Sequence, residues 1–296
     1  MTSIFYALLA ILSWSTAATA FKLALSQINP PLLVFFSSFF SSVVLLVILI
    51  LYRRKKAFKG LTFKTILNYA KIGLINPFIY YLVLFYAYSL TLAQEALILN
   101  YTWGIFLVIF ASLLLKQRLK ILSLLSLLIS FFGVIILTTK GNLLHFSISL
   151  GIGNLLALGS AVIWALYWIL NLKNPEDPVL SLFFQFLAGS IFSFIVCLIS
   201  SNNLKLSGSS IIYPIYIGIF EMSVPFVFWF LALKSASETA KVANLIYLSP
   251  FLSLLFISSI LKEPIHYSSI VALIFIIVGI IFQQSQKEQG IRHRNV

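Results

Sequence analysis

The sequence predicts an all-α integral membrane protein: ten transmembrane helices, arranged as two inverted five-helix repeats, with both termini in the cytoplasm. Three observations lead to this prediction. Of the 296 residues, 61% are hydrophobic and only 9% are charged, with a mean hydropathy of +1.06, whereas a soluble domain usually carries about 25% charged residues. The basic residues gather in loops that fall on one side of the membrane, and the second half of the chain repeats the first half.

The apolar stretches of the chain are long enough to cross a bilayer, which takes about 20 residues of helix. Breaking the chain at polar and turn-forming clusters gives ten of them, at about 4–24, 32–52, 66–89, 94–115, 120–139, 148–170, 179–200, 211–233, 240–261 and 267–285. The breaks include Asn29-Pro30-Pro31, Lys140-Gly141-Asn142 and the run from Asn174 to Pro178. The uncharged leader Met1-Thr2-Ser3 lacks a clear cleavage site, so the first stretch is expected to stay as a helix.

The 20 Lys and Arg residues indicate the orientation. If the loops alternate sides, sixteen basic residues fall on one side, and only Lys22, Lys140, Lys205 and Lys262 fall on the other. This asymmetry predicts cytoplasmic termini in a multi-pass protein of the plasma membrane, that is, the bacterial or archaeal cytoplasmic membrane. The net charge of +13 is then a topology signal, so we expect lipid and not nucleic acid as the partner of the basic loops.

An internal repeat relates the two halves. At an offset of 146, Leu99 and Tyr101 match Leu245 and Tyr247, Lys116-Gln117 matches Lys262-Glu263, and Gly133 matches Gly279; at 145, Gly73 matches Gly218, Asn76 matches Glu221, and Ala87 matches Ala232. We expect five-helix repeats at 1–140 and 148–285 and a polar cytoplasmic tail at 286–296. Because five is odd, the second repeat enters the membrane from the opposite side, as in carriers that expose one site alternately to either side.

Four runs carry a resemblance to a known family: Leu12-Ser13-Trp14 through Lys22, Tyr101 through Leu119, Val162 through Tyr167, and Ala243 through Pro264. They resemble the EamA-type ten-helix members of the drug/metabolite transporter superfamily over nearly the whole chain. The resemblance implies an inner-membrane secondary carrier with a central cavity, and export of amino acids or related metabolites as the first expectation. Members often have Arg early in the second helix, where this chain has Phe36-Ser37-Ser38, so any role of that Arg does not transfer.

Glu221 is the most informative single residue, because a charge in the middle of a span is costly and marks function by default. It lies about ten residues into the eighth stretch, hence about 15 Å deep. A carboxyl group there must be neutral, paired or in contact with water. It could carry a coupling proton, hold the ammonium group of a substrate, or make a structural hydrogen bond to a neighbouring helix.

Other polar and aromatic residues complete the candidate substrate and coupling cavity. Asn76 matches Glu221 in the repeat and could face it across the cavity, or only repair the backbone at Pro77. Asn100 with Trp103, and Asn244 with Tyr247, are spaced so that each pair shares a helix face. Trp14, Tyr80, Trp164 and Tyr167 add aromatic surface, although many aromatic residues must face lipid. Lys22 could bind an anion or extend to the outer interface.

Other classes of protein are not expected. Cys197 has no intrachain partner, and the three His residues have no metal-ligand spacing, so neither metal nor cofactor is predicted. No loop carries a nucleophile–base pair or a P-loop, which argues against a membrane enzyme or an ATP-driven pump. The alternatives that stay open are a carrier of nucleobases, sugars or cationic drugs, and a receptor or scaffold without transport. A monomer or dimer would suffice, with a small molecule, and optionally protons, as partners.

Overall fold

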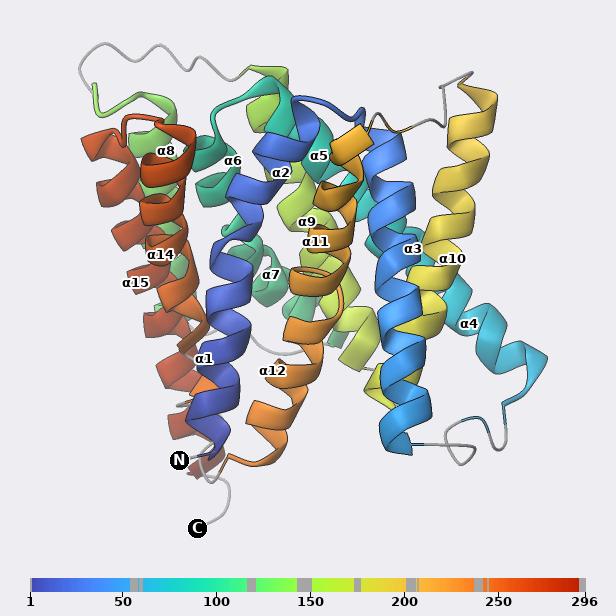
Figure 1. The fold of residues 1–296 in the computed structure, drawn as a ribbon. Coiled ribbons are helices and arrows are strands. Elements are labelled where there is room, and N and C mark those ends of the chain that lie inside the picture. Colours follow the sequence, from blue (N-terminus) through green and yellow to red (C-terminus); the bar gives the residue numbers. More distant parts are fainter. Residues whose placement is uncertain are drawn as a thin grey trace.

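The computed structural model describes residues 2–53, 58, 61–115, 121–142, 151–172, 177–200, 206, 208–236, 242–243 and 245–292, and this part of the chain is a bundle of helices without strands. Helix α1 begins and α15 ends at the same end of the bundle (Figure 1). The first half contains α1 (Thr2–Ser15), α2 (Ala17–Leu25), α3 (Pro30–Ile48), α4 (Phe63–Gly73), α5 (Tyr80–Leu90), α6 (Ala93–Asn100), α7 (Trp103–Leu115) and α8 (Ile121–Thr138). The second half contains α9 (Ile152–Leu172), α10 (Pro178–Ile199), α11 (Ile212–Phe220), α12 (Val224–Lys234), α14 (Leu248–Phe256) and α15 (Tyr267–Arg292).

Several neighbouring helices join into longer spans. Seven segments of the described chain are long and apolar enough to cross a membrane: Thr2–Leu25, Pro30–Leu51, Phe63–Leu90, Ala93–Leu114, Ile152–Asn171, Pro178–Ile199 and Gly208–Lys234. Three shorter apolar helices are Leu128–Leu137, Leu245–Leu261 and Tyr267–Phe282. The all-helical membrane class predicted from the sequence is therefore confirmed. The count of ten spans and the orientation stay predictions.

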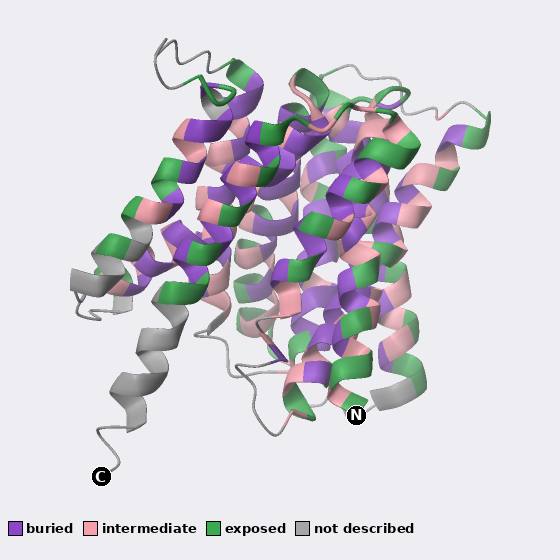
Figure 2. Cartoon of the chain, turned by 90° about the vertical axis from the view of Figure 1, so that its left-hand side faces the viewer, coloured by how far each residue is buried: buried purple, intermediate pink, exposed green. Residues whose placement is uncertain are grey.

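Burial in the bundle is the reverse of that in a soluble protein. Along α10 the large apolar side chains Ile191, Ile195 and Leu198 are exposed, whereas Gln185 and Ser193 are buried. Exposed and buried residues also alternate along the helices that face the viewer in Figure 2. Without water outside the bundle, apolar side chains can face lipid, and polar ones find their partners between helices. This distribution fits a bundle that lies in hydrocarbon.

Two spans break near their middle. A π-helical turn (Leu74–Ile79) joins α4 to α5, and within it Asn76 has extended backbone angles (φ −140°, ψ 123°) beside Pro77. In the other half, α11 ends at Phe220 and α12 begins at Val224, with Pro225 in its first turn. Proline removes a helical donor and clashes with the preceding turn, so the bends follow from the sequence.

The packing between helices repeats when the two halves are exchanged. Helix α3 contacts α10 and α8 contacts α15, and the remaining major contacts form matched pairs: α1–α12 with α5–α9, α3–α11 with α4–α10, and α1–α14 with α7–α9. Two matched glycines permit the closest approaches. A Cβ on Gly73 would lie 2.5 Å from the carbonyl oxygen of Gln185, and one on Gly218 would lie 2.8 Å from that of Ser37. Small residues at such contacts let membrane helices pack backbone to backbone.

Candidate substrate cavity

A cavity of about 260 Å³ lies at the centre of the bundle, between the two halves of the chain. Its walls come from α1, α2, α5, α6, α7, α9 and α12, from the break that contains Glu221, and from the segment around Tyr247. The break between α11 and α12 thus lies where side chains from both halves converge. We call this space the central cavity.

The structure brings together seven of the eleven residues expected at the site. Those lining the central cavity are Glu221, Asn100, Trp14, Trp103, Trp164, Tyr80 and Tyr247. Asn76, Tyr167 and Lys22 lie outside the lining. Asn244 falls outside the described residues. The spacing of Asn100 and Trp103 predicted that they share a face, and both line the cavity. Tyr247, from the other half of the chain, also lines it.

Glu221 is held at the break between α11 and α12. The hydroxyl of Tyr81 donates to its Oε1 at 3.0 Å, and the indole of Trp14 donates to its main-chain oxygen at 3.2 Å. Its other carboxyl oxygen, Oε2, is buried and has no hydrogen-bonding partner. A buried carboxylate oxygen without a protein partner is costly, so a proton, a bound cation or water in the cavity has to satisfy this group.

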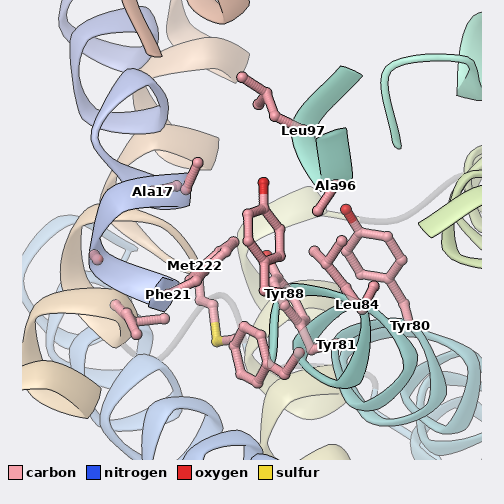
Figure 3. Packing of buried hydrophobic residues seen from close by; sticks show 14 of the residues in the cluster. Ala17, Phe21, Tyr80, Tyr81, Leu84, Tyr88, Ala96, Leu97 and Met222 are labelled. Atoms are coloured by element: carbon pink, nitrogen blue, oxygen red, sulfur yellow. The ribbon is translucent and has the colours of Figure 1, made fainter. Parts of the chain in front are cut away.

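Aromatic rings form much of the wall around this carboxyl group. Trp164 stacks on Tyr80, with ring centroids 4.6 Å apart, while Trp14 meets Phe226 edge-on at 5.4 Å. On the side of α5, Tyr81 packs against Phe21 of α2 (Figure 3), with ring centroids 6.3 Å apart. These contacts fix the rings, because each is supported by a neighbour from another helix.

One polar chain also lines the cavity. The Tyr80 hydroxyl donates to Asn100 Oδ1 at 3.4 Å, and Asn100 Nδ2 donates to Ser160 Oγ at 2.9 Å. The Ser160 hydroxyl in turn donates to the main-chain oxygen of Ala157 at 2.6 Å. The Asn100 amide is therefore oriented by helices on both sides and can present a polar group to a ligand.

Asn76 and Tyr167 belong to a separate buried contact. The Tyr167 hydroxyl donates to Gln185 Oε1 at 3.0 Å and also lies near the Asn76 amide. That amide is fully buried and makes no well-formed hydrogen bond. Asn76 therefore does not face Glu221 across the cavity. Repeat matching placed the two residues at equivalent breaks, but the helices around them differ.

Lys22 lies at the end of the bundle opposite to the start of α1 (Figure 1). Its Nζ donates to the main-chain oxygens of Tyr88 at 2.7 Å and Thr91 at 2.5 Å, where the α5 span ends. Both carboxyl oxygens of Glu263 accept from the main-chain N–H of Ala93 at 3.1 Å, and the Glu263 charge also attracts Lys22. Glu263 thus caps the start of α6.

Further bonds tie this end together. Asn154 Nδ2 and the Thr91 hydroxyl donate to Glu95 Oε2 at 3.1 and 2.8 Å, and Gln94 Nε2 donates to the main-chain oxygen of Pro264 at 2.9 Å. We call the set of Lys22, Thr91, Gln94, Glu95, Asn154 and Glu263 the capped end. It joins segments from both halves of the chain.

The sequence argument missed several residues of the site, and three of them illustrate why. Tyr81, the partner of Glu221, carries no signal that separates it from the other tyrosines. Phe226 also lines the cavity, and one phenylalanine among 28 cannot be singled out by composition. Tyr101 lines the cavity too, and here a signal existed, because it matches Tyr247 in the repeat.

Comparisons with known proteins agree with this architecture. The model of the EamA-like transporter family matches residues 1–139 and 151–283. An "Uncharacterized transporter" of Clostridium kluyveri is 27% identical over 69% of this chain and 68% of its own length, and one of Archaeoglobus fulgidus is 26% identical over 75% and 78%. A crystal structure of another protein, 21% identical, covers 97% of this chain and 98% of its own with a TM-score of 0.67, which shows a shared fold.

Proposed function

This chain belongs to the EamA-like transporter family, and we propose that it is a secondary transporter that moves a small amino-bearing metabolite out of the cell by alternating access. Its relatives bear the names of transporters, and membrane transport of small molecules is the function that this membership carries. Amino acids or related compounds are the first candidate cargo. Proton exchange through Glu221 is the proposed driving mechanism.

The central cavity is the observation that carries this proposal. It lies between the two halves of the chain and holds a carboxyl group with one buried oxygen that has no partner. Such a group can be satisfied in turn by a proton and by the ammonium of a cargo molecule. A single carboxyl that alternates between the two would couple outward movement of cargo to inward movement of protons.

Two inverted five-helix repeats, at 1–140 and 148–285, would supply the symmetry that alternating access needs. Support comes from the matched helix contacts, which recur when the halves are exchanged. It also comes from the seven long spans together with the three shorter apolar helices. In this arrangement, ten spans cross the membrane, and the end that holds the start of α1 faces the cytoplasm.

The capped end would act as the closed gate of one state. Its hydrogen bonds join α6 to Glu263 and Pro264, and α9 to α6 through Asn154 and Glu95. If the two repeats exchanged their packing arrangements, this end would open and the other end would close. The bonds of Glu263 and Asn154 to α6 would then break, because they bridge the two halves.

Flux in proteoliposomes tests the proposal. Purified protein is reconstituted, a pH gradient is imposed, and movement of radiolabelled amino acids and simple amines is followed beside a pH-sensitive dye. We expect solute flux accompanied by proton flux, and loss of the pH dependence in Glu221→Gln. Full flux with unchanged pH dependence in that variant would remove Glu221 from coupling.

Asp177→Asn is the matched control for this experiment, since it also converts a carboxylate to an amide. Asp177 lies outside the cavity, and its side chain caps α10 through bonds to Val179 and Leu180. Asparagine caps helices as well as aspartate does. Flux and pH dependence should therefore stay at their original levels in this variant.

A further inference from the structure

The tryptophans of this chain are not distributed as in most membrane proteins. The chain has five, and all five line the central cavity: Trp14, Trp103, Trp164, Trp168 and Trp229. Tryptophan in membrane proteins is otherwise enriched at the two lipid–water interfaces. Here α1, α7, α9 and α12 each direct at least one indole to the same space, so the cavity, and not the lipid boundary, determines where tryptophan occurs.

The cavity is also one-sided in charge. Glu221 is the acidic side chain in its lining, and none of the described lining residues is Lys, Arg or His. Lys22, which could have met an anion, is bonded to two main-chain oxygens at the capped end. A ligand carboxylate entering this space would meet no cationic side chain. The aromatic faces and the ionised form of Glu221 repel negative charge, and the donors in the lining are neutral, among them the buried Nε1 of Trp168, which has no hydrogen-bonding partner.

Aromatic faces and a carboxylate favour the same kind of group. Indole is the best side chain for cation–π contact, which strengthens where water is excluded. Oε2 of Glu221 lacks a partner and would accept from an ammonium group. At about 260 Å³, the cavity is slightly smaller than ordinary ligand pockets of about 300–1,000 Å³, which suits a molecule with one ring.

We infer that the central cavity binds a small organic cation bearing an aromatic or apolar group, in preference to the zwitterionic amino acid with the same side group. This inference rests on the proposed function and narrows its cargo from amino compounds to amines. Binding of R–NH₃⁺ to the protonated Glu221 gives the ion pair and releases one proton to water. Charge and atoms balance, and amine and proton therefore compete for one carboxyl group.

The sign of the pH effect follows from that competition. As pH rises, fewer protons compete for Glu221, so the amine should bind more tightly while it stays protonated itself. The titratable groups around Glu221 are the hydroxyls of Tyr80, Tyr81, Tyr88 and Tyr101. Phenols stay neutral near pH 7, so a pH dependence in that range reports on the carboxyl group.

Three related ligands test the inference. Phenethylamine, phenylalanine and 3-phenylpropionate share the phenyl ring and its CH₂ group, and they carry an ammonium, both an ammonium and a carboxylate, and a carboxylate alone. Because every tryptophan lines the cavity, intrinsic fluorescence of the purified protein, excited where a benzene ring does not absorb, reports on binding directly. We expect phenethylamine to bind at least about tenfold more tightly than phenylalanine. Equal or tighter binding of phenylalanine, or binding of none of the three, would overturn the inference.

Two variants locate the effect. In Glu221→Gln the preference for the amine should fall to about one, whereas in Asp177→Asn it should stay unchanged, because that carboxylate caps α10. A retained preference in Glu221→Gln would contradict the assignment of the ammonium to this residue. If phenylalanine binds best and is carried across proteoliposomes, the inference about charge fails and the transport proposal stands. If the amine binds but neither compound crosses, transport itself fails.

Discussion

The two helix breaks in the middle of the bundle start from equivalent positions of the repeat and end in different surroundings. In the first half, Asn76 is fully buried and lies beside Tyr167, at a turn that packs against α10. In the second half, Glu221 lies against the central cavity and is held by Tyr81 on one oxygen only. Both breaks hold a buried polar atom without a hydrogen-bonding partner.

The difference shows that an unpartnered polar group can have a structural role at one break and a ligand-binding role at the other, depending on whether a cavity lies beside it. The Asn76 amide is fully buried and lies outside the lining of the central cavity, so its surroundings are other protein groups. At Glu221, a ligand or a proton can reach the carboxyl group from the cavity. In the proposed function, the first break therefore only bends its span, whereas the second break provides the carboxyl group that contacts the cargo.

An exchange of side chains should give the largest effect. Asn76→Glu would place a carboxyl group at a fully buried position outside the central cavity, at a cost of about 2.5–3.5 kcal/mol or more, and should lower thermal stability in detergent sharply. Glu221→Asn should cost less, about 0.5–1.5 kcal/mol, because it exchanges one polar group at the cavity for another and loses only the hydrogen bond from Tyr81. Unfolding followed by intrinsic fluorescence measures both. Equal losses in the two variants would contradict the contrast between the breaks.

Much of the fold and the positions of both breaks could be predicted from the sequence. Hydropathy alone predicted the helical membrane class, and Pro77 and Pro225 predicted bends. The repeat placed Asn76 opposite Glu221 in the alignment, and the depth of Glu221 identified it as exceptional. Spacing along one helix grouped Asn100 with Trp103 because helix geometry is local.

What the sequence could not provide is the direction in which a span faces after it bends. Tyr167 was expected at the cavity together with Trp164, but three residues further along α9 the hydroxyl points to Gln185. The sequence related Glu263 only to Gln117 in the repeat, yet its side chain caps a helix of the other half. Such contacts depend on which helices meet across the bundle, and apolar periodicity is weak where lipid and protein are equally apolar.

A second prediction concerns the glycines that precede the two breaks. Although the breaks differ in their surroundings, substitution of either glycine should lower the stability by a similar amount. A Cβ at Gly73 or Gly218 would meet a backbone oxygen of α10 or α3, so Gly73→Ala and Gly218→Ala should each cost about 1–3 kcal/mol. Gly159→Ala is the control, since nothing lies within 4 Å of its Cβ position, and alanine there should stabilise α9 by up to about 1 kcal/mol. A loss in only one half would show that the matched packing is not equivalent.

The smallest expected effect concerns the hydrogen bond from Tyr81 to Glu221. It tests whether this bond only positions the carboxyl group or is also needed for proton exchange. Tyr81→Phe removes the hydroxyl that donates to Oε1 and keeps the ring that packs on Phe21, so only one hydrogen bond, worth about 0.5–1.5 kcal/mol, is lost. Amine binding and flux should change by less than about tenfold, with the pH dependence retained. Tyr88→Phe is the matched control on the same helix, because the Tyr88 ring also packs on Phe21, with centroids 5.4 Å apart. If Tyr81→Phe abolished the pH dependence as completely as Glu221→Gln, the carboxyl group would act only together with this hydroxyl. The functional difference between the two breaks would then depend on Tyr81 of α5 as well as on Glu221.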